Sequence, residues 1–184
     1  MTIPLESLKD ILMITSDAYE VGEITDVRYD PFEWDVKGLK IKARRSSGKL
    51  SAGFGKTAFM FLPQDFVLND VMLLSQPIEI IKDAIVPDNN NISSLSSMIN
   101  AKVVTRDNAL VGTVVTAMID TELWKVSSII VRLDKTAIEA MKMKKSLFSK
   151  INVEIRANII LSSTDMVHLD EQMDGVREKM AVLD

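Results

Sequence analysis

The chain has 184 residues, of which 47% are hydrophobic, 26% charged and 5% aromatic, as in ordinary folded soluble proteins. Its formal charge of −4 argues against a general DNA- or RNA-binding protein, because such proteins usually carry a clear excess of basic residues. The absence of cysteine excludes disulfides, zinc–thiolate sites and cysteine nucleophiles. The sequence shows neither a signal peptide nor an apolar run of about 18 residues that could span a membrane, so a soluble cytoplasmic protein is expected.

The first half of the chain predicts β-strands separated by turns. Leu39, Ile41 and Ala43 alternate with basic residues, which is the two-residue period of a strand buried on one face. Val36 has the opposite parity to Leu39, so a bulge or bend is expected near Gly38 if both side chains face the core. The segment is therefore expected to be a bent strand of a small, closing barrel.

The second half follows a turn-rich linker, Pro87–Asn91. In its matching strand, Ile129 is expected to point into the core and Ile130 outward, toward solvent or a partner. A second bulge is expected near Ser128. Asp134 can cap a helix that extends over residues 134–148.

The end of the chain, residues 171–184, predicts an amphipathic helical tail. Its apolar residues recur at steps of 3, 4 and 3, namely Met173, Val176, Met180 and Leu183. Such a stripe can lie in the groove of a partner, or it can pack on the second half of the chain itself.

Residues of the first half recur 90 positions later in the second half. Trp34 and Trp124 occupy one repeat position, and Gly22 and Gly112 occupy another. Other matches include Ile14 with Val104, Thr15 with Thr105, Asp17 with Asp107, Val21 with Val111, Asp30 with Asp120 and Val36 with Val126. Further along, the offset increases to 95, where Leu73 aligns with His168. The predicted organisation is two tandem copies, 1–87 and 92–170, joined by a linker at 88–91 and followed by the tail.

This duplicated pattern resembles the PRC-barrel family. The motifs that carry the resemblance are an apolar-Thr-x-Asp start, a Val-Gly turn, a strand ending in aspartate, and a tryptophan before an apolar strand, each present twice. The resemblance implies an all-β fold with minor helices, built as two tandem PRC-type β-barrels. The tandem arrangement resembles archaeal two-barrel proteins of FtsZ-based cell division, which act with the membrane-associated adaptor SepF.

No catalytic, cofactor-binding or metal-binding residues are predicted. His168 is the only histidine, and its apolar counterpart Leu73 indicates a packing position. The segment Gly53–Thr57 lacks the first glycine of a phosphate-binding loop, because Leu50 stands at that position. Asp17 and its counterpart fall where turns begin, and there aspartate usually bonds nearby backbone. We therefore expect no bound metal or nucleotide.

The candidate interface residues belong to three features. The tail contributes Met173, Val176, Met180 and Leu183, and the second-half strand contributes Ile130. A basic run without acids contributes Lys40, Lys42 and Arg44. That run is typical of a solvated strand face with lysines guarding an edge, and a surface for acidic proteins, lipid headgroups or nucleic acid is the alternative.

The sequence thus favours a non-enzymatic adaptor that binds other proteins, with the division assembly implied by the family resemblance. The expected partners are a SepF-like adaptor or a second two-barrel protein, in a homo- or hetero-oligomer, with DNA excluded and the membrane approached only indirectly. The alternative is an RNA-processing or ribosome-assembly factor like RimM, which would bind RNA or a ribosomal protein through the basic strand. RNA is the less favoured partner because few aromatic residues are available for stacking.

Overall fold

The computed structural model describes residues 1–43, 57–88, 92–143, 150–163 and 165–183. The chain forms two compact units, one of residues 5–30 and 36–94 and the other of residues 1–4, 31–35 and 95–184. We call them the first-repeat unit and the second-repeat unit. Each holds one sheet and a few short helices, which confirms the predicted all-β class with minor helices.

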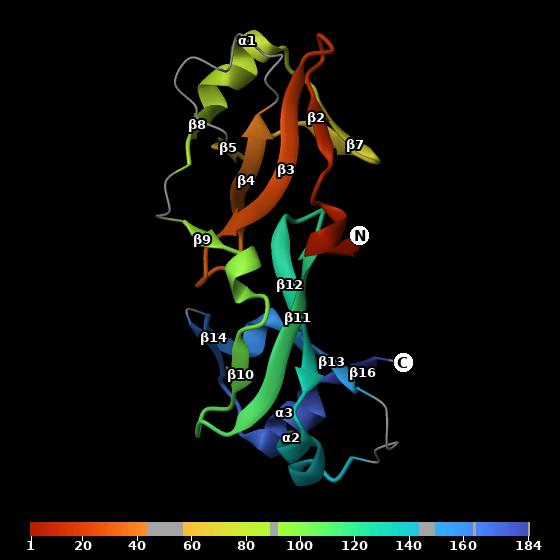
Figure 1. Cartoon of the computed structure of the whole chain (residues 1–184), viewed down its shortest axis with the longest axis vertical. Helices are drawn as coiled ribbons and strands as arrows, with labels where there is room; N and C mark the ends of the chain where they lie inside the picture. Colours follow the sequence, from red (N-terminus) through yellow and green to blue (C-terminus); the bar gives the residue numbers. More distant parts are fainter. Residues whose placement is uncertain (44–56, 89–91, 144–149, 164, 184) are drawn as a thin grey trace. The chain divides into compact units, whose positions relative to one another are not determined.

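The sheet of the first-repeat unit has the strand order β6-β7-β2-β3-β4-β5-β8, with β9 added beside β3 (Figure 1). Its strands are β2 (Leu12–Ile14), β3 (Glu20–Tyr29), β4 (Val36–Ala43), β5 (Ala58–Phe61), β6 (Phe66–Leu68), β7 (Val71–Leu74), β8 (Ile85–Pro87) and β9 (Ser93–Ser94). The unit also contains helix α1 (Ile78–Ile81) and the 3-10 turns η1 (Leu5–Ser7) and η2 (Lys82–Ala84). Within this sheet β2 and β7 run parallel, and the other neighbours are antiparallel.

The sheet of the second-repeat unit has the matching order β14-β15-β10-β11-β12-β13-β16, with β1 beside β11. Its strands are β1 (Thr2–Pro4), β10 (Lys102–Val104), β11 (Leu110–Asp120), β12 (Lys125–Leu133), β13 (Asn152–Arg156), β14 (Ile160–Ser163), β15 (Met166–Leu169) and β16 (Ala181–Leu183). Helices α2 (Lys135–Ala140) and α3 (Met173–Lys179) and the turns η3 (Ser96–Met98) and η4 (Ala157–Ile159) accompany it. Here β10 and β15 are the parallel pair.

The two sheets are completed at equivalent repeat positions by very short strands. In the first-repeat unit Ser94 of β9 lies opposite Arg28, and in the second-repeat unit Pro4 of β1 lies opposite Met118. Each sheet therefore contains the N-terminal strand of the other sequence copy. For this reason the boundaries of the compact units differ from the expected boundaries at 87 and 92. The sequence did not predict the exchange, because strands of two or three residues are too short to show a periodicity.

The repeat extends to unusual backbone conformations. Six non-glycine residues with a left-handed φ form three pairs 90 positions apart, at Asp10 and Asn100, Ala18 and Asn108, and Trp34 and Trp124. A left-handed φ is rare outside glycine, so its recurrence shows that the same tight turns are rebuilt in both copies. Lys142 is the only other described non-glycine residue with positive φ.

The aspartates at the predicted turns accept hydrogen bonds from nearby groups, and Asp17 also accepts one from the distant Ile78 N–H at 3.1 Å. The Thr15 hydroxyl donates to the Asp17 carboxylate at 2.5 Å, and Thr105 donates to Asp107 at 2.6 Å. Asp120 accepts hydrogen bonds from two backbone N–H groups of the following turn, at 2.9 and 3.1 Å, which lower its pKa. These contacts agree with the predicted structural role.

Both predicted bulges are present. Arg28 pairs with Gly38 and Tyr29 with Val36, so Lys37 is the extra residue in β4. The second sheet has its register shift between Ser128 and Val126. The bulge allows Val36 and Leu39 to be buried together despite their opposite parity.

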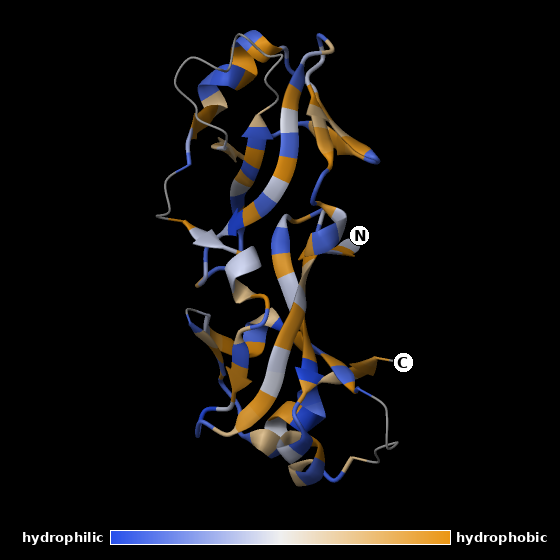
Figure 2. Ribbon diagram, viewed as in Figure 1, coloured by the Kyte–Doolittle hydropathy of each residue, from blue (hydrophilic) through white to orange (hydrophobic). Residues whose placement is uncertain are grey.

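Repeat-related apolar side chains form the core of each unit, and Figure 2 shows the alternation of apolar and polar residues along β3 and β4. The fully buried pairs are Met13 and Val103, Val21 and Val111, Leu39 and Ile129, and Ile41 and Val131. None of the helices in the described ranges combines the length and hydrophobicity needed to cross a bilayer.

Replacing Gly22 or Gly112 with alanine should lower the free energy of unfolding by about 2 kcal/mol, because the added methyl overlaps the carbonyl oxygen of the paired strand, at Lys42 or Arg132. Thermal or urea unfolding measures the loss. Gly175→Ala is the control, since its methyl meets only the flexible side chain of Glu171. A loss in the control equal to that in the two strand variants would contradict this account.

Candidate protein-interaction site

The C-terminal segment differs from the single helix that its periodicity predicts. Helix α3 ends at Lys179, Met180 has an extended backbone, and Ala181–Leu183 form strand β16. Val176 is fully buried, so it packs within its own unit and is not available to a partner. Met173 and Met180 are half-buried, and Leu183 is exposed. The prediction of one continuous helical stripe is therefore wrong, because backbone pairing with β13 favours the extended form.

Strand β16 forms one edge of its sheet. Its three residues pair antiparallel with β13, Leu183 opposite Asn152 and Ala181 opposite Glu154. Within the described ranges no strand pairs with its other side. The side chain of Val182 is 55% exposed. An apolar edge strand with free backbone groups is a template for pairing with another chain.

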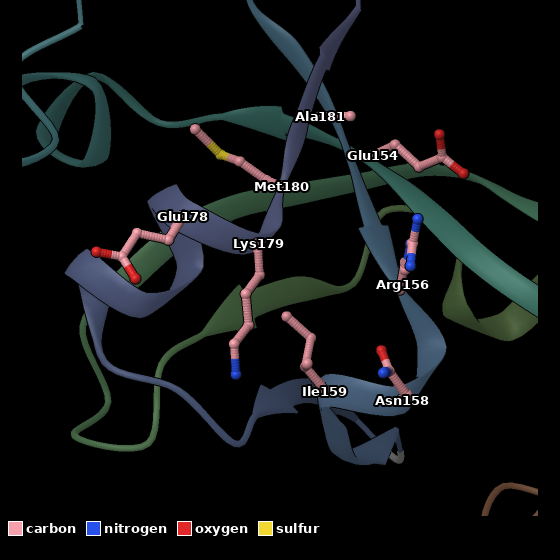
Figure 3. A pocket seen from close by; sticks show the side chains of 8 residues that line it. All are labelled: Glu154, Arg156, Asn158, Ile159, Glu178, Lys179, Met180 and Ala181. Atoms are coloured by element: carbon pink, nitrogen blue, oxygen red, sulfur yellow. The ribbon is translucent and has the colours of Figure 1, made fainter.

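A pocket of about 490 Å³ lies beside this edge, which is within the usual size range of ligand sites (Figure 3). It lies between the end of β13 with the following turn η4 and the junction of α3 with β16. The lining side chains are Glu154, Arg156, Asn158, Ile159, Glu178, Lys179, Met180 and Ala181. One predicted interface residue, Met180, is among them.

Some charged side chains of the pocket lining have partners within the described residues, and others have none. Glu154 accepts a hydrogen bond from the Ser128 hydroxyl at 2.5 Å, and Lys179 forms an ion pair with Glu171. Arg156 is exposed and has no hydrogen-bond or ion-pair partner within the described part of the chain. In Figure 3 the carboxylate of Glu178 lies at the left end of the group and that of Glu154 at the upper right, whereas Arg156 and Asn158 follow below Glu154.

The other predicted interface residues lie elsewhere. Ile130, expected outward, is only 8% exposed, because four consecutive residues of β12 are buried and both faces of the strand are covered. Lys40 is half-buried and pairs with Asp88 at 2.8 Å, while Lys42 is exposed. Arg44 lies outside the described residues. The described basic residues therefore belong to the first-repeat unit and the tail to the second-repeat unit.

The first-repeat unit contains a buried charge cluster that sequence reasoning missed. The guanidinium of Arg28 contacts both carboxylate oxygens of Asp88 at 2.9 and 3.1 Å, and the two side chains are 6% and 8% exposed. Arg28 also donates to the carbonyl of Ile92. Burial acts to raise the pKa of Asp88, but Lys40 and Arg28 together hold that pKa below its ordinary value of 3.8. One sequence signal was available, since the repeat equivalents of Arg28 and Lys40 are the apolar Met118 and Ile130.

A second apolar surface lies on the first-repeat unit. Val67 and Leu73 are cross-strand neighbours on β6 and β7, and both are exposed. The equivalent pair on β14 and β15 is Ser162 and His168. His168 thus occupies the repeat position of Leu73, as predicted. The predicted packing position is wrong, because Leu73 is exposed and His168 is only half-buried. No group of three side chains suited to metal binding occurs in the described ranges.

Neither a family model nor a curated protein matches the sequence. The open edge of β16 and its pocket combine exposed apolar side chains with backbone groups and a cation that have no partner among the described residues.

Proposed function

We propose that the protein is a non-enzymatic interaction module that binds an extended segment of a partner protein along β16. The observation that carries the proposal is the apolar edge strand whose outer side is unpaired among the described residues. A partner strand added there gains main-chain hydrogen bonds, and adjoining pockets select its side chains. The absence of cysteine and the single histidine support a role without covalent catalysis.

The setting that we propose is an archaeal FtsZ-based division assembly, in which the chain acts as a cytoplasmic adaptor. The partners to test first are a SepF-like adaptor and a second two-barrel protein. This setting depends on the PRC-barrel resemblance of the repeated motifs. The RimM-like alternative has less support, because Lys40 of the basic strand is already paired with Asp88.

Substituting lysine at both Val182 and Leu183 should weaken partner binding by about tenfold or more, because lysines on an edge strand oppose the addition of another strand. Pull-down and calorimetry with the SepF-like protein and with a second two-barrel protein measure the effect. Leu161→Lys is the matched control, because Leu161 lies on β14 at the other edge of the same sheet and has the same 55% exposure as Val182. Equal affinities for the wild type and the double variant would refute the site.

A further inference from the structure

We infer that the segment bound by β16 carries a carboxylate and that the pocket beside the strand receives it. This inference depends on the proposed function and names the chemistry of its partner. Ala181 both pairs with β13 and lines the pocket. A strand laid along β16 therefore passes from the apolar side chains of Val182 and Leu183 to the mouth of the pocket.

The charge of the lining determines which group fits. Arg156 contributes a guanidinium without a partner among the described residues, and Asn158 adds an amide that can donate. Lys179 is already paired with Glu171, so Arg156 is the main source of uncompensated positive charge. The carboxylates of Glu154 and Glu178 lie away from the middle of the pocket (Figure 3). A planar guanidinium favours a carboxylate, which it can hold through two parallel hydrogen bonds.

The apolar side chains of the lining indicate which groups lie next to the carboxylate of the ligand. Ile159 and Met180 complete the pocket beside the donors. They provide contacts for methylene groups next to the carboxylate. The occupant is therefore an acidic side chain within an otherwise apolar extended peptide.

The first experiment uses acetate as a carboxylate probe on the full chain. In NMR titrations at constant ionic strength, acetate should produce saturable shifts of the Arg156 side-chain N–H and the Ala181 amide, and chloride should not. Arg156→Gln should abolish the shift of the Ala181 amide. Arg177→Gln is the matched control, since Arg177 is an exposed arginine on α3 that does not line the pocket. Equal shifts with chloride, or an Ala181 shift that persists in Arg156→Gln, would overturn the inference.

The second experiment uses hexapeptides with an acetylated N-terminus. The amidated peptide TVTVEV should bind the wild type about tenfold more tightly than amidated TVTVQV, and Arg156→Gln should remove this preference. TVTVQV with a free terminal carboxylate tests the other source of the group, and a gain from the free terminus at least as large as the gain from glutamate would overturn the acidic side chain as the occupant. Equal affinity for the glutamate and glutamine peptides overturns the carboxylate inference and leaves edge pairing intact. Acetate binding without any peptide-induced shift in β16 instead contradicts the proposed function.

Discussion

Replacing Asp88 with asparagine should lower the free energy of unfolding of the first-repeat unit by about 3 kcal/mol. The Asp88 carboxylate is the acidic partner of both Arg28 and Lys40 among the described residues. Removing one member of a buried ion pair leaves the remaining charge uncompensated in a poorly solvated environment. Urea unfolding monitored by residue-resolved NMR measures the loss in this unit.

The control for Asp88 is Asp170→Asn, which breaks the exposed pair with Arg106 and should cost less than about 1 kcal/mol.

The pH dependence of stability gives a second test of the role of Asp88. Because the folded-state pKa of Asp88 is lowered, its contribution is complete above the ordinary value of 3.8 and is lost as the pH falls through the folded value. The stability difference between wild type and Asp88→Asn should therefore shrink only in strong acid. A difference that instead disappears between neutral pH and pH 5 would contradict this role.

Val176→Asp should destabilise the second-repeat unit by about 3 kcal/mol or more, because it buries a carboxylate where Val176 is fully enclosed. Thermal unfolding measures the change. Arg177→Asp places the same charge on the next, exposed residue of α3 and should be nearly neutral. Equal melting temperatures for wild type and Val176→Asp would show that α3 does not pack on its unit.

Deleting the tail should affect both stability and binding. Removing residues 171–184 deletes both the buried Val176 and a paired edge strand, so the melting temperature should fall together with partner binding. A deletion therefore cannot separate a binding tail from a packing tail. The substitutions at Val182 and Leu183 can, because both side chains are exposed.

The fold could be predicted from the sequence where a pattern extended over many residues or occurred in both copies. The offset of 90 residues between copies located the equivalent turns, and the parity of Val36 against Leu39 located a bulge. Asp134 caps helix α2 through the Thr136 N–H at 2.9 Å, as its position predicted. The helix ends at Ala140, which is short of the predicted 148, and residues 144–149 lie outside the described ranges.

The interaction site was less readable, because the patterns that define it are short or non-local. The spacing of the four apolar tail residues fits a helix throughout. It does not reveal that the chain changes from helix to strand at Ala181. Arg156 carries no local motif, and its role depends on the pocket formed where α3 meets β16. Ile130 alternates like an outward residue, yet its neighbours on both sides are buried.

Backbone hydrogen exchange of the partner-bound chain tests the central claim most directly. The partner is the SepF-like adaptor or the second two-barrel protein, whichever binds the 184-residue chain in the pull-down. The account predicts that amides of Ala181–Leu183 become protected on binding, and that this protection is lost with the lysine variant of Val182 and Leu183. Protection confined to β6 and β7 around Val67 and Leu73, with β16 unchanged, would contradict it.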